Sequence, residues 1–285
     1  MNNVLRTLIY DGQVSLTVAN TTEMVKEGIG LHHLTPLSAA VFGRTMSAMT
    51  FMSACLKNEV GEISLSVKSD GLGGDIAVSG NSKLRIRGYI DNTALAGEVN
   101  PENEKKCFGT NGALTIIRDD GYRRPFVGSC AFLEGGGVDE AFEEYYRISE
   151  QLPTRVCTAV EFVEDGTLVF AGVIAVQPLP FADENTLNKV EQLPLKDLLN
   201  QVKTEGLIAC VEKNFPVDKT VWEERKATYK CNCSRNYLTR VLVSLGEEQM
   251  RQIIKEDGAV RIHCHYCNTD YEFFSEDADA LFPKE

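Results

Sequence analysis

Alternation of hydrophobic and polar positions dominates the first two thirds of the chain and predicts strands. A meander of three strands is expected over residues 63–67, 75–78 and 84–89, separated by the turn clusters Asp70-Gly71 and Gly80-Asn81-Ser82. Short apolar runs predict further strands over residues 14–18, 114–118, 126–132, 155–162 and 168–176. Because strands follow one another with only occasional helices and no steady β-α-β rhythm, the pattern predicts an α+β fold with antiparallel sheets.

A period of 3.6 residues predicts helices between these strands. Thr35-Pro36 supplies a cap and a first-turn proline for a helix that runs to about Lys57 with one buried face. Met46, Met49 and Met52 lie on this helix, and although methionine suits adaptable binding surfaces, core packing is the preferred interpretation. Further helices are predicted over residues 138–151 and, after Pro194, over an amphipathic stretch at residues 195–202.

Composition and prolines divide the chain into three predicted parts. Pro178 and Pro180 close a large mixed core of α+β type, residues 1–178, and a helical linker is expected over residues 179–228. Residues 229–285 form the third part, a small cysteine-bearing module. Polar residues dominate from 212 to 230, which fits either a mostly solvated connection or an exposed amphipathic helix that meets a partner. The sequence does not separate these two.

The charge balance narrows the class of partner. The formal net charge is −12, so the summed field should repel nucleic acid and anionic membrane surfaces, and a protein partner is favoured. The N-terminal residues lack the basic and apolar regions of a secretory signal, and no apolar run reaches the ~18 residues needed to span a bilayer. We therefore expect a cytoplasmic protein.

Nine cysteines are many for a cytosolic protein, and their spacing separates them into two groups. Five are scattered singly and are interpreted as small buried hydrophobic residues, namely Cys55, Cys107, Cys130, Cys157 and Cys210. The other four form two tight pairs, Cys231 with Cys233 and Cys264 with Cys267. Two such pairs complete a tetrahedral shell of soft ligands, so the spacing predicts a site for one zinc ion.

Local patterns place the second cysteine pair on a turn. Residues 259–263 and 271–274 are expected to pair as strands, and two helices are expected between the cysteine pairs, the second ending at Gly258. So short a segment with few apolar groups should depend on metal for much of its folding free energy. His263 and His265 flank Cys264 and are possible substitute ligands, but four thiolates already suffice.

The first pair has features of a reactive site. Cys233 directly precedes Ser234, a candidate helix cap, and the partial positive charge of a helix N-terminus stabilises a thiolate. Oxidation of the ligands to disulfides would remove the thiolates, release zinc and couple oxidation to unfolding. On this chemistry alone, a permanently reduced module with a purely structural zinc ion is equally well supported.

Motifs for catalysis are weak, so we expect no enzyme. Gly71-Leu72-Gly73-Gly74 lacks the third glycine of a dinucleotide loop, no Gly-x-x-x-x-Gly-Lys phosphate loop is present, and nothing points to ATP binding. Two rival functions remain open. One is a constitutive zinc-ribbon protein that binds a partner, and the other is an enzyme that uses a cleft in the core.

Motifs spread over nearly the whole chain resemble one known family. The tail reads Cys231-x-Cys233-Ser234-Arg235, then Cys264-x-x-Cys267 with Tyr271 beyond it. Upstream lie YYRISEQLPT at residues 145–154, Gln177-Pro178-Leu179-Pro180, Arg87-Gly88-Tyr89, Ser69-Asp70-Gly71 and the helix after Thr35-Pro36 with its Gly43-Arg44. Together these resemble the heat shock protein 33 family of redox-regulated cytosolic chaperones.

The resemblance implies a holdase that binds unfolding proteins without ATP. In that family the reduced, zinc-bound form is inactive, and oxidation forms one disulfide within each cysteine pair. Here those would join Cys231 with Cys233 and Cys264 with Cys267. Zinc is then released, the linker unfolds, and the exposed surface binds unfolded client proteins in a stress response to oxidants, with homodimers as the active species.

Overall fold

The computed structural model describes residues 3–133, 136–217 and 221–283, and the chain divides into two compact units. The first unit is Met1–Lys230 and the second is Cys231–Glu285. Both mix helices with sheets, which confirms the predicted α+β class. Among the described residues, no helix combines the length and apolar character needed to cross a bilayer.

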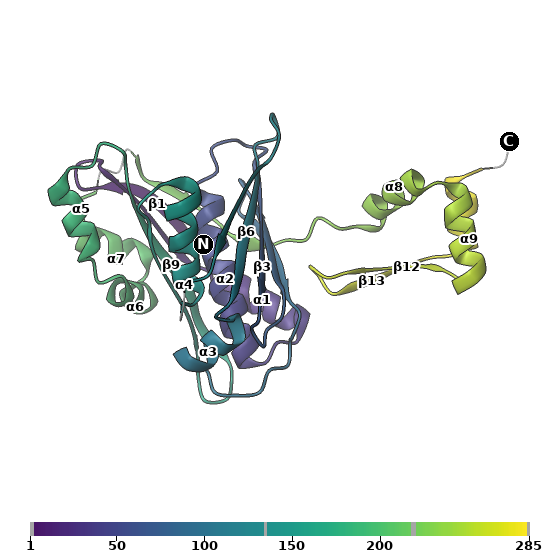
Figure 1. Ribbon diagram of the computed structural model, residues 1–285, viewed down its shortest axis with the longest axis horizontal. Coiled ribbons are helices and arrows are strands. Elements are labelled where there is room, and N and C mark those ends of the chain that lie inside the picture. Colours follow the sequence, from purple (N-terminus) through teal and green to yellow (C-terminus); the bar gives the residue numbers. More distant parts are fainter. Residues whose placement is uncertain (1–2, 134–135, 218–220, 284–285) are drawn as a thin grey trace. The chain divides into compact units, whose positions relative to one another are not determined.

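A five-stranded antiparallel sheet forms one half of the first unit (Figure 1). Its order is β10 (Glu223–Arg225), β1 (Val4–Ile9), β2 (Val14–Asn20), β9 (Leu168–Pro178) and β8 (Arg155–Phe162). β9 is buried along nearly its whole length because helices contact it on both faces. β2, β8 and β9 occupy predicted positions, whereas the patterns did not predict β1.

A six-stranded sheet forms the other half. Its order is β11 (Thr228–Tyr229), β5 (Arg85–Ile90), β4 (Ile76–Asn81), β3 (Glu62–Ser69), β6 (Gly112–Asp119) and β7 (Phe126–Ala131). The predicted meander is confirmed, since β3 pairs antiparallel with β4 and β4 with β5. β11 is an exception to the antiparallel order because it arrives from far along the chain and pairs with β5 in parallel.

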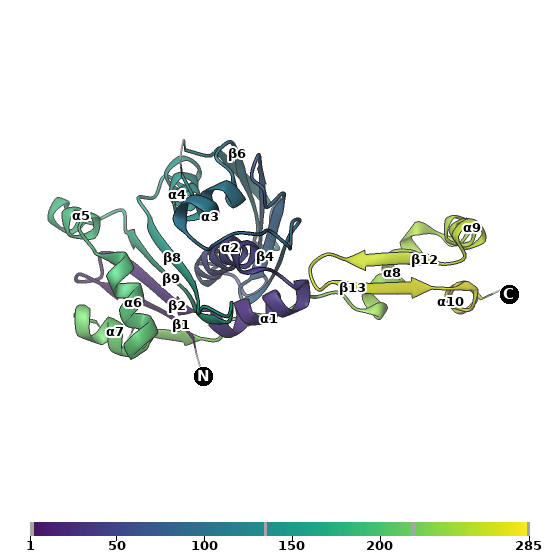
Figure 2. The same cartoon turned by 90° about the horizontal axis from the view of Figure 1, so that it is seen from below.

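Helix α2 (Pro36–Ala54) lies between the two sheets (Figure 2) and contacts strands of both. The prediction of one buried face is wrong, because nearly every residue of α2 is buried, and the helix ends at Ala54 rather than near Lys57. An apolar helix surrounded by packing partners has no polar face to show. Met46, Met49 and Met52 are completely buried, so their interpretation as core residues is confirmed.

Three shorter helices pack against α2. They are α1 (Thr22–His32), α3 (Pro101–Phe108) and α4 (Val138–Tyr145), which continues as one π-helical turn, η1 (Tyr146–Glu150). The single helix predicted over residues 138–151 is thus an α-helix that widens before it ends at Gln151, which has a left-handed backbone (φ 53°). The patterns did not predict α3, whose acidic first turn follows the cap residue Asn100.

Three helices cover the outer face of the five-stranded sheet, namely α5 (Glu184–Glu191), α6 (Leu195–Glu205) and α7 (Leu207–Asn214). The predicted amphipathic helix is confirmed as α6. Together with the strands beneath, these helices form a second apolar cluster, whose buried members are Leu5, Ile9, Val14, Leu16, Val18, Phe170, Ile174, Val176, Val190, Leu195, Leu198, Leu199, Val202, Cys210, Val211 and Phe215. The stretch before Cys231 is exposed at its polar residues, but β10 and β11 tie it to both sheets. The division at residues 178 and 228 stays a prediction.

The second unit, as far as the structure describes it (to residue 283), contains a small two-stranded sheet and three helices. Its elements are α8 (Arg235–Leu245), α9 (Glu247–Asp257), β12 (Val260–Cys264), β13 (Thr269–Phe273) and α10 (Ser275–Leu281). The predicted strand pair and both predicted helices are confirmed, including the helix end at Gly258. Among its described residues the main apolar cluster has the buried members Leu238, Leu242, Met250, Val260, Phe273 and Ala278, and Ala259 is also buried.

Candidate metal centre

Two local structures present the four cysteines of the second unit. Cys231 and Cys233 precede α8, whose cap is Ser234, and the Ser234 hydroxyl accepts a hydrogen bond from the Tyr237 amide at 3.1 Å. The predicted cap is therefore confirmed. On the other side, Cys264 ends β12, and the Cys267 amide donates to the Cys264 carbonyl at 3.2 Å within the turn to β13. Both pairs are thus held by hydrogen-bonded backbone.

The four sulfur atoms lie within 4.8 Å of one another and could hold a metal ion. Sγ of Cys233 is 3.3 Å from Sγ of Cys231 and 3.1 Å from Sγ of Cys267, and Sγ of Cys231 is 3.6 Å from Sγ of Cys264. A tetrahedral zinc site with Zn–S bonds of about 2.3 Å spaces its sulfurs by about 3.8 Å. The three separations given are somewhat shorter than that value, and no two of the four sulfurs are more than 4.8 Å apart, so the donor set suits one ion bound by four thiolates.

Hydrogen bonds concentrate negative charge on Cys233. Burial alone would raise its pKa, but hydrogen bonds from the Tyr271 hydroxyl, at 3.3 Å, and from the neighbouring thiols lower the pKa of Cys233 to about 7. Burial and the proximity of Cys233 raise the pKa of Cys264 and Cys267. One thiolate stabilised by several proton donors is the arrangement expected where a cation would replace the protons.

The two neighbouring histidines do not join the cluster. Among the described residues, the metal-capable group consists of the four cysteines alone. His263 directly precedes Cys264 on β12, and successive side chains of a strand point to opposite faces. Nδ1 of His263 instead lies 2.7 Å from a carboxylate oxygen of Asp270.

Two residues that support the site were not assigned these roles from the sequence. The Tyr271 hydroxyl lies 3.3 Å from Sγ of Cys233. Tyr271 is on β13, directly opposite Ile262 of β12, and only the register of the two strands places it there. Arg235 joins α8 to the far side of the module, since its guanidinium donates to the Glu272 carbonyl at 2.8 Å and pairs with Asp277 at 2.6 Å. The same guanidinium lies over the Phe273 ring, 4.4 Å from its centroid.

The five scattered cysteines lie in a different environment. Cys107, Cys130 and Cys210 are buried as predicted, whereas Cys55 and Cys157 are only partly buried. Burial raises the pKa of all five, to about 12 for Cys107 and Cys157 and about 11 for Cys130. These thiols stay protonated at neutral pH and are poor targets for oxidants.

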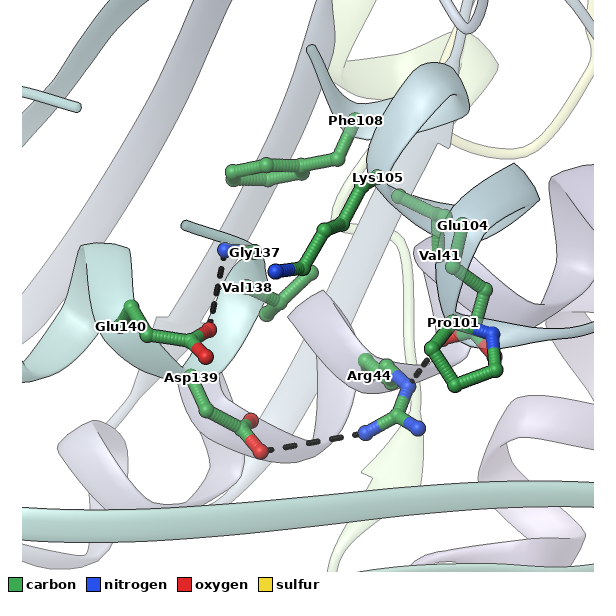
Figure 3. A pocket seen from close by; sticks show the side chains of 10 residues that line it. All are labelled: Val41, Arg44, Pro101, Glu104, Lys105, Phe108, Gly137, Val138, Asp139 and Glu140. Atoms are coloured by element: carbon green, nitrogen blue, oxygen red, sulfur yellow. Dashed lines mark hydrogen bonds and ion pairs between the residues drawn. The ribbon is translucent and has the colours of Figure 1, made fainter. Parts of the chain in front are cut away.

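Charged side chains of α2, α3 and α4 line one pocket of the first unit (Figure 3). Its volume is about 190 Å³, below the ~300 Å³ at which small-molecule sites usually begin. Its ionic groups hold elements together. Arg44 of α2 pairs with Glu104 of α3 at 2.5 Å and with Asp139 of α4 at 3.8 Å, and Asp139 accepts hydrogen bonds from the amide and hydroxyl of Thr158. These interactions connect α2, α3, α4 and β8, so we interpret the network as structural.

Comparison with known proteins connects this architecture to one family. The family model described as Hsp33 protein matches residues 2–274. The 33 kDa chaperonin of Bacillus licheniformis is 34% identical, with 99% of each chain covered, and that of Bacillus subtilis is 32% identical, with 99% of this chain and 98% of the relative covered. The crystal structure of the 33 kDa chaperonin from Thermotoga maritima shares the fold, with a TM-score of 0.82, 23% identity and 98% of this chain covered.

The fold and the cysteine cluster together define the class as a two-unit α+β protein with a four-thiol module. The family match and the full-length identities narrow that class further. The chain belongs to the Hsp33 family.

Proposed function

We propose that the protein is a redox-regulated holdase chaperone, inactive while its four cysteines hold zinc. Oxidation forms two disulfides, releases zinc and unfolds residues 179–228, and the exposed surface binds unfolding proteins. The observation that carries the proposal is the meeting of four thiols within 4.8 Å on a unit whose main apolar cluster, among the described residues, has six buried members. Such a unit depends on its metal for stability, so loss of the thiolates is loss of the fold.

Disulfides within each pair are part of the proposal. The folded sulfur positions do not select this pairing, since Cys233 is as close to Cys267 as to Cys231. Support comes from chain connectivity. Once metal leaves and the unit loosens, the partners two or three residues apart meet far more often than partners more than thirty residues apart.

Residues 179–228 connect the switch to client binding in this proposal. α6 and α7 bury their apolar faces against the five-stranded sheet, in the second apolar cluster. Release of these helices would uncover apolar side chains of β1, β2 and β9, and exposed apolar area is what an ATP-independent chaperone offers to unfolded chains. A homodimeric active state and a cytoplasmic location complete the proposal, the latter because a reducing compartment keeps the thiols available for metal.

The test compares zinc-loaded protein before and after peroxide treatment with mild heating. Metal release, free thiols and suppression of aggregation of a thermally unfolding client are measured on the same samples. We expect four thiols lost per metal released, disulfides mapped by mass spectrometry to Cys231–Cys233 and Cys264–Cys267, and client capture only after oxidation. Cys107→Ser serves as the matched control and should behave as the wild type, because the Cys107 thiol is buried and protonated.

Two different outcomes would contradict two different parts of the proposal. Metal release without gain of client capture contradicts the holdase assignment. Retention of metal and of all nine thiols under the same treatment contradicts the switch and supports a constitutive zinc-ribbon binding protein with structural zinc.

A further inference from the structure

A groove on the first unit, separate from the cysteine cluster, runs between α4 and α5. Its volume is about 580 Å³, within the range of peptide and small-molecule sites. Its lining is mainly apolar: Leu133, Pro153 and Leu187 are at least partly exposed, and the buried residues Pro178 and Val190 lie beneath them. We refer to it as the acidic groove because glutamates rim it.

The rim carries an excess of carboxylates. Four glutamates line the groove, namely Glu140, Glu143, Glu144 and Glu191, against two arginines. Both guanidiniums are engaged within the protein. Arg147 binds both carboxylate oxygens of Glu144, at 2.6 and 2.7 Å, and Arg155 donates to three main-chain carbonyls at the end of α5.

Within the described part of the chain, three of the glutamates have no ion-pair partner. Arg155 attracts Glu143 from a greater distance, and Glu140 and Glu143 accept hydrogen bonds from the amides of Gly137 and Val156 at 2.9 and 2.8 Å. Over residues 3–133, 136–217 and 221–283, no ion pair involves Glu140, Glu143 or Glu191. Burial also raises the pKa of Glu143, as expected for a desolvated carboxylate with too little compensating charge. A ligand cation placed beside these groups would supply the missing charge.

Helix α5 is held as a preformed wall. The Arg155 guanidinium fixes its C-terminal end through the Val190, Glu191 and Leu193 carbonyls, at 2.7 to 3.0 Å. At its N-terminal end the Asp183 amide donates to the Gln13 side chain at 2.7 Å. A rigid wall reduces the entropy lost when a ligand binds.

We infer that the acidic groove docks a short peptide segment in which a large apolar side chain is flanked by lysine or arginine. The apolar lining receives the large side chain, and Glu140, Glu143 and Glu191 pair with the flanking cations. Because α5 lies within residues 179–228, the groove exists only while those residues are folded, a point that rests on the proposed function. Binding to the folded form alone stabilises it, so such a segment opposes activation.

The test uses a fluorescein-labelled, end-blocked hexapeptide, Lys-Arg-Leu-Phe-Lys-Arg, and fluorescence anisotropy with reduced, zinc-loaded protein. Two matched peptides separate the contributions, Glu-Glu-Leu-Phe-Glu-Glu for charge and Lys-Arg-Ser-Ser-Lys-Arg for the apolar anchor. We expect the first peptide to bind at least ten times more tightly than either control. Equal binding of the cationic peptides would show only attraction to an acidic protein and overturn the inference, as would no binding at all.

Protein variants locate the site. Glu140→Gln combined with Glu191→Gln, and separately Leu187→Ser, should each weaken binding at least about tenfold, as expected when two charge pairs or one apolar anchor are lost. The control, Glu23→Gln with Glu27→Gln, removes two exposed carboxylates of α1 and should leave binding unchanged. Wild-type affinity in both groove variants overturns the assignment.

Oxidation tests whether peptide binding requires residues 179–228 to be folded. A peroxide-treated sample that has released its metal and captures clients should lose affinity for the peptide, and retained affinity would overturn the state dependence. A sample that releases metal and gains no client capture refutes the proposed function instead, while the measurements on reduced protein still decide whether the groove docks the peptide.

Discussion

Asp139 should make the first unit more stable as pH falls, opposite to the usual behaviour of an ion-paired carboxylate. Burial raises its pKa from 3.8 to about 6, against the attraction of Arg44 and the hydrogen bonds from Thr158. The folded state therefore binds a proton more readily than the unfolded state does. Ionisation costs the folded state stability, and that cost disappears as pH falls from about 6 through 3.8.

Asp139→Asn isolates this effect. Asparagine keeps an oxygen for the Thr158 hydrogen bonds but does not titrate, so its own effect on stability is a constant offset, and the attraction of Arg44 is already contained in the pKa of Asp139. The two pKa values predict that the wild type gains about 2 kcal/mol relative to the variant between pH 6.5 and 4.5. The offset cancels in this difference of differences.

Urea unfolding at each pH, followed by the fluorescence of Trp222, measures the free energy of unfolding of the first unit. Trp222 is the only tryptophan and packs against the second apolar cluster. Asp165→Asn is the control, since hydrogen bonds from Thr167 lower the pKa of this exposed carboxyl, and its stability contribution is lost only below pH 3.8. A stability difference, wild type minus Asp139→Asn, that stays flat or becomes smaller as pH is lowered from 6.5 to 4.5 would refute the reasoning and show that Arg44 outweighs burial.

Three further predictions concern the second unit and helix packing. Cys231→Ser should lower metal affinity by more than the roughly 10–100-fold typical of an outer-shell change, by competition with a chelator, whereas Cys55→Ser should keep full metal content. Phe273→Ala, at a side chain 1% exposed, should destabilise the second unit by about 3–5 kcal/mol in amide hydrogen exchange, and unchanged protection there would contradict the core assignment. Gly43→Ala places a methyl group 2.8 Å from Val25 and should lower the free energy of unfolding in urea by about 1–3 kcal/mol. The control is Gly30→Ala, which has open space around the new methyl group and should raise the free energy of unfolding by up to about 1 kcal/mol. Equal effects of the two changes would argue against the close packing of α2.

Local patterns were sufficient where a segment's own residues decide its structure. The start of α8 at Ser234 follows from side-chain capping, and the end of α9 at Gly258 follows from the left-handed backbone that glycine tolerates. The β12–β13 pair follows from two short apolar runs around a turn. The patterns failed where contacts with residues distant in the sequence determine burial. Helix α2 is the example, because its hydrophobic period predicts one buried face, whereas sheets cover it on both sides.

Taken by itself, the sequence determined the α+β class, the strand meander, the helix caps of the module and the grouping of four cysteines into two pairs, because each depends on residues close together along the chain. Tertiary structure alone decided that the four sulfurs lie within 4.8 Å, that Tyr271 donates to Cys233, and that α4 and α5 enclose an acidic groove. These features join residues separated by tens of positions. Their proximity is set by packing and strand register, which no local period encodes.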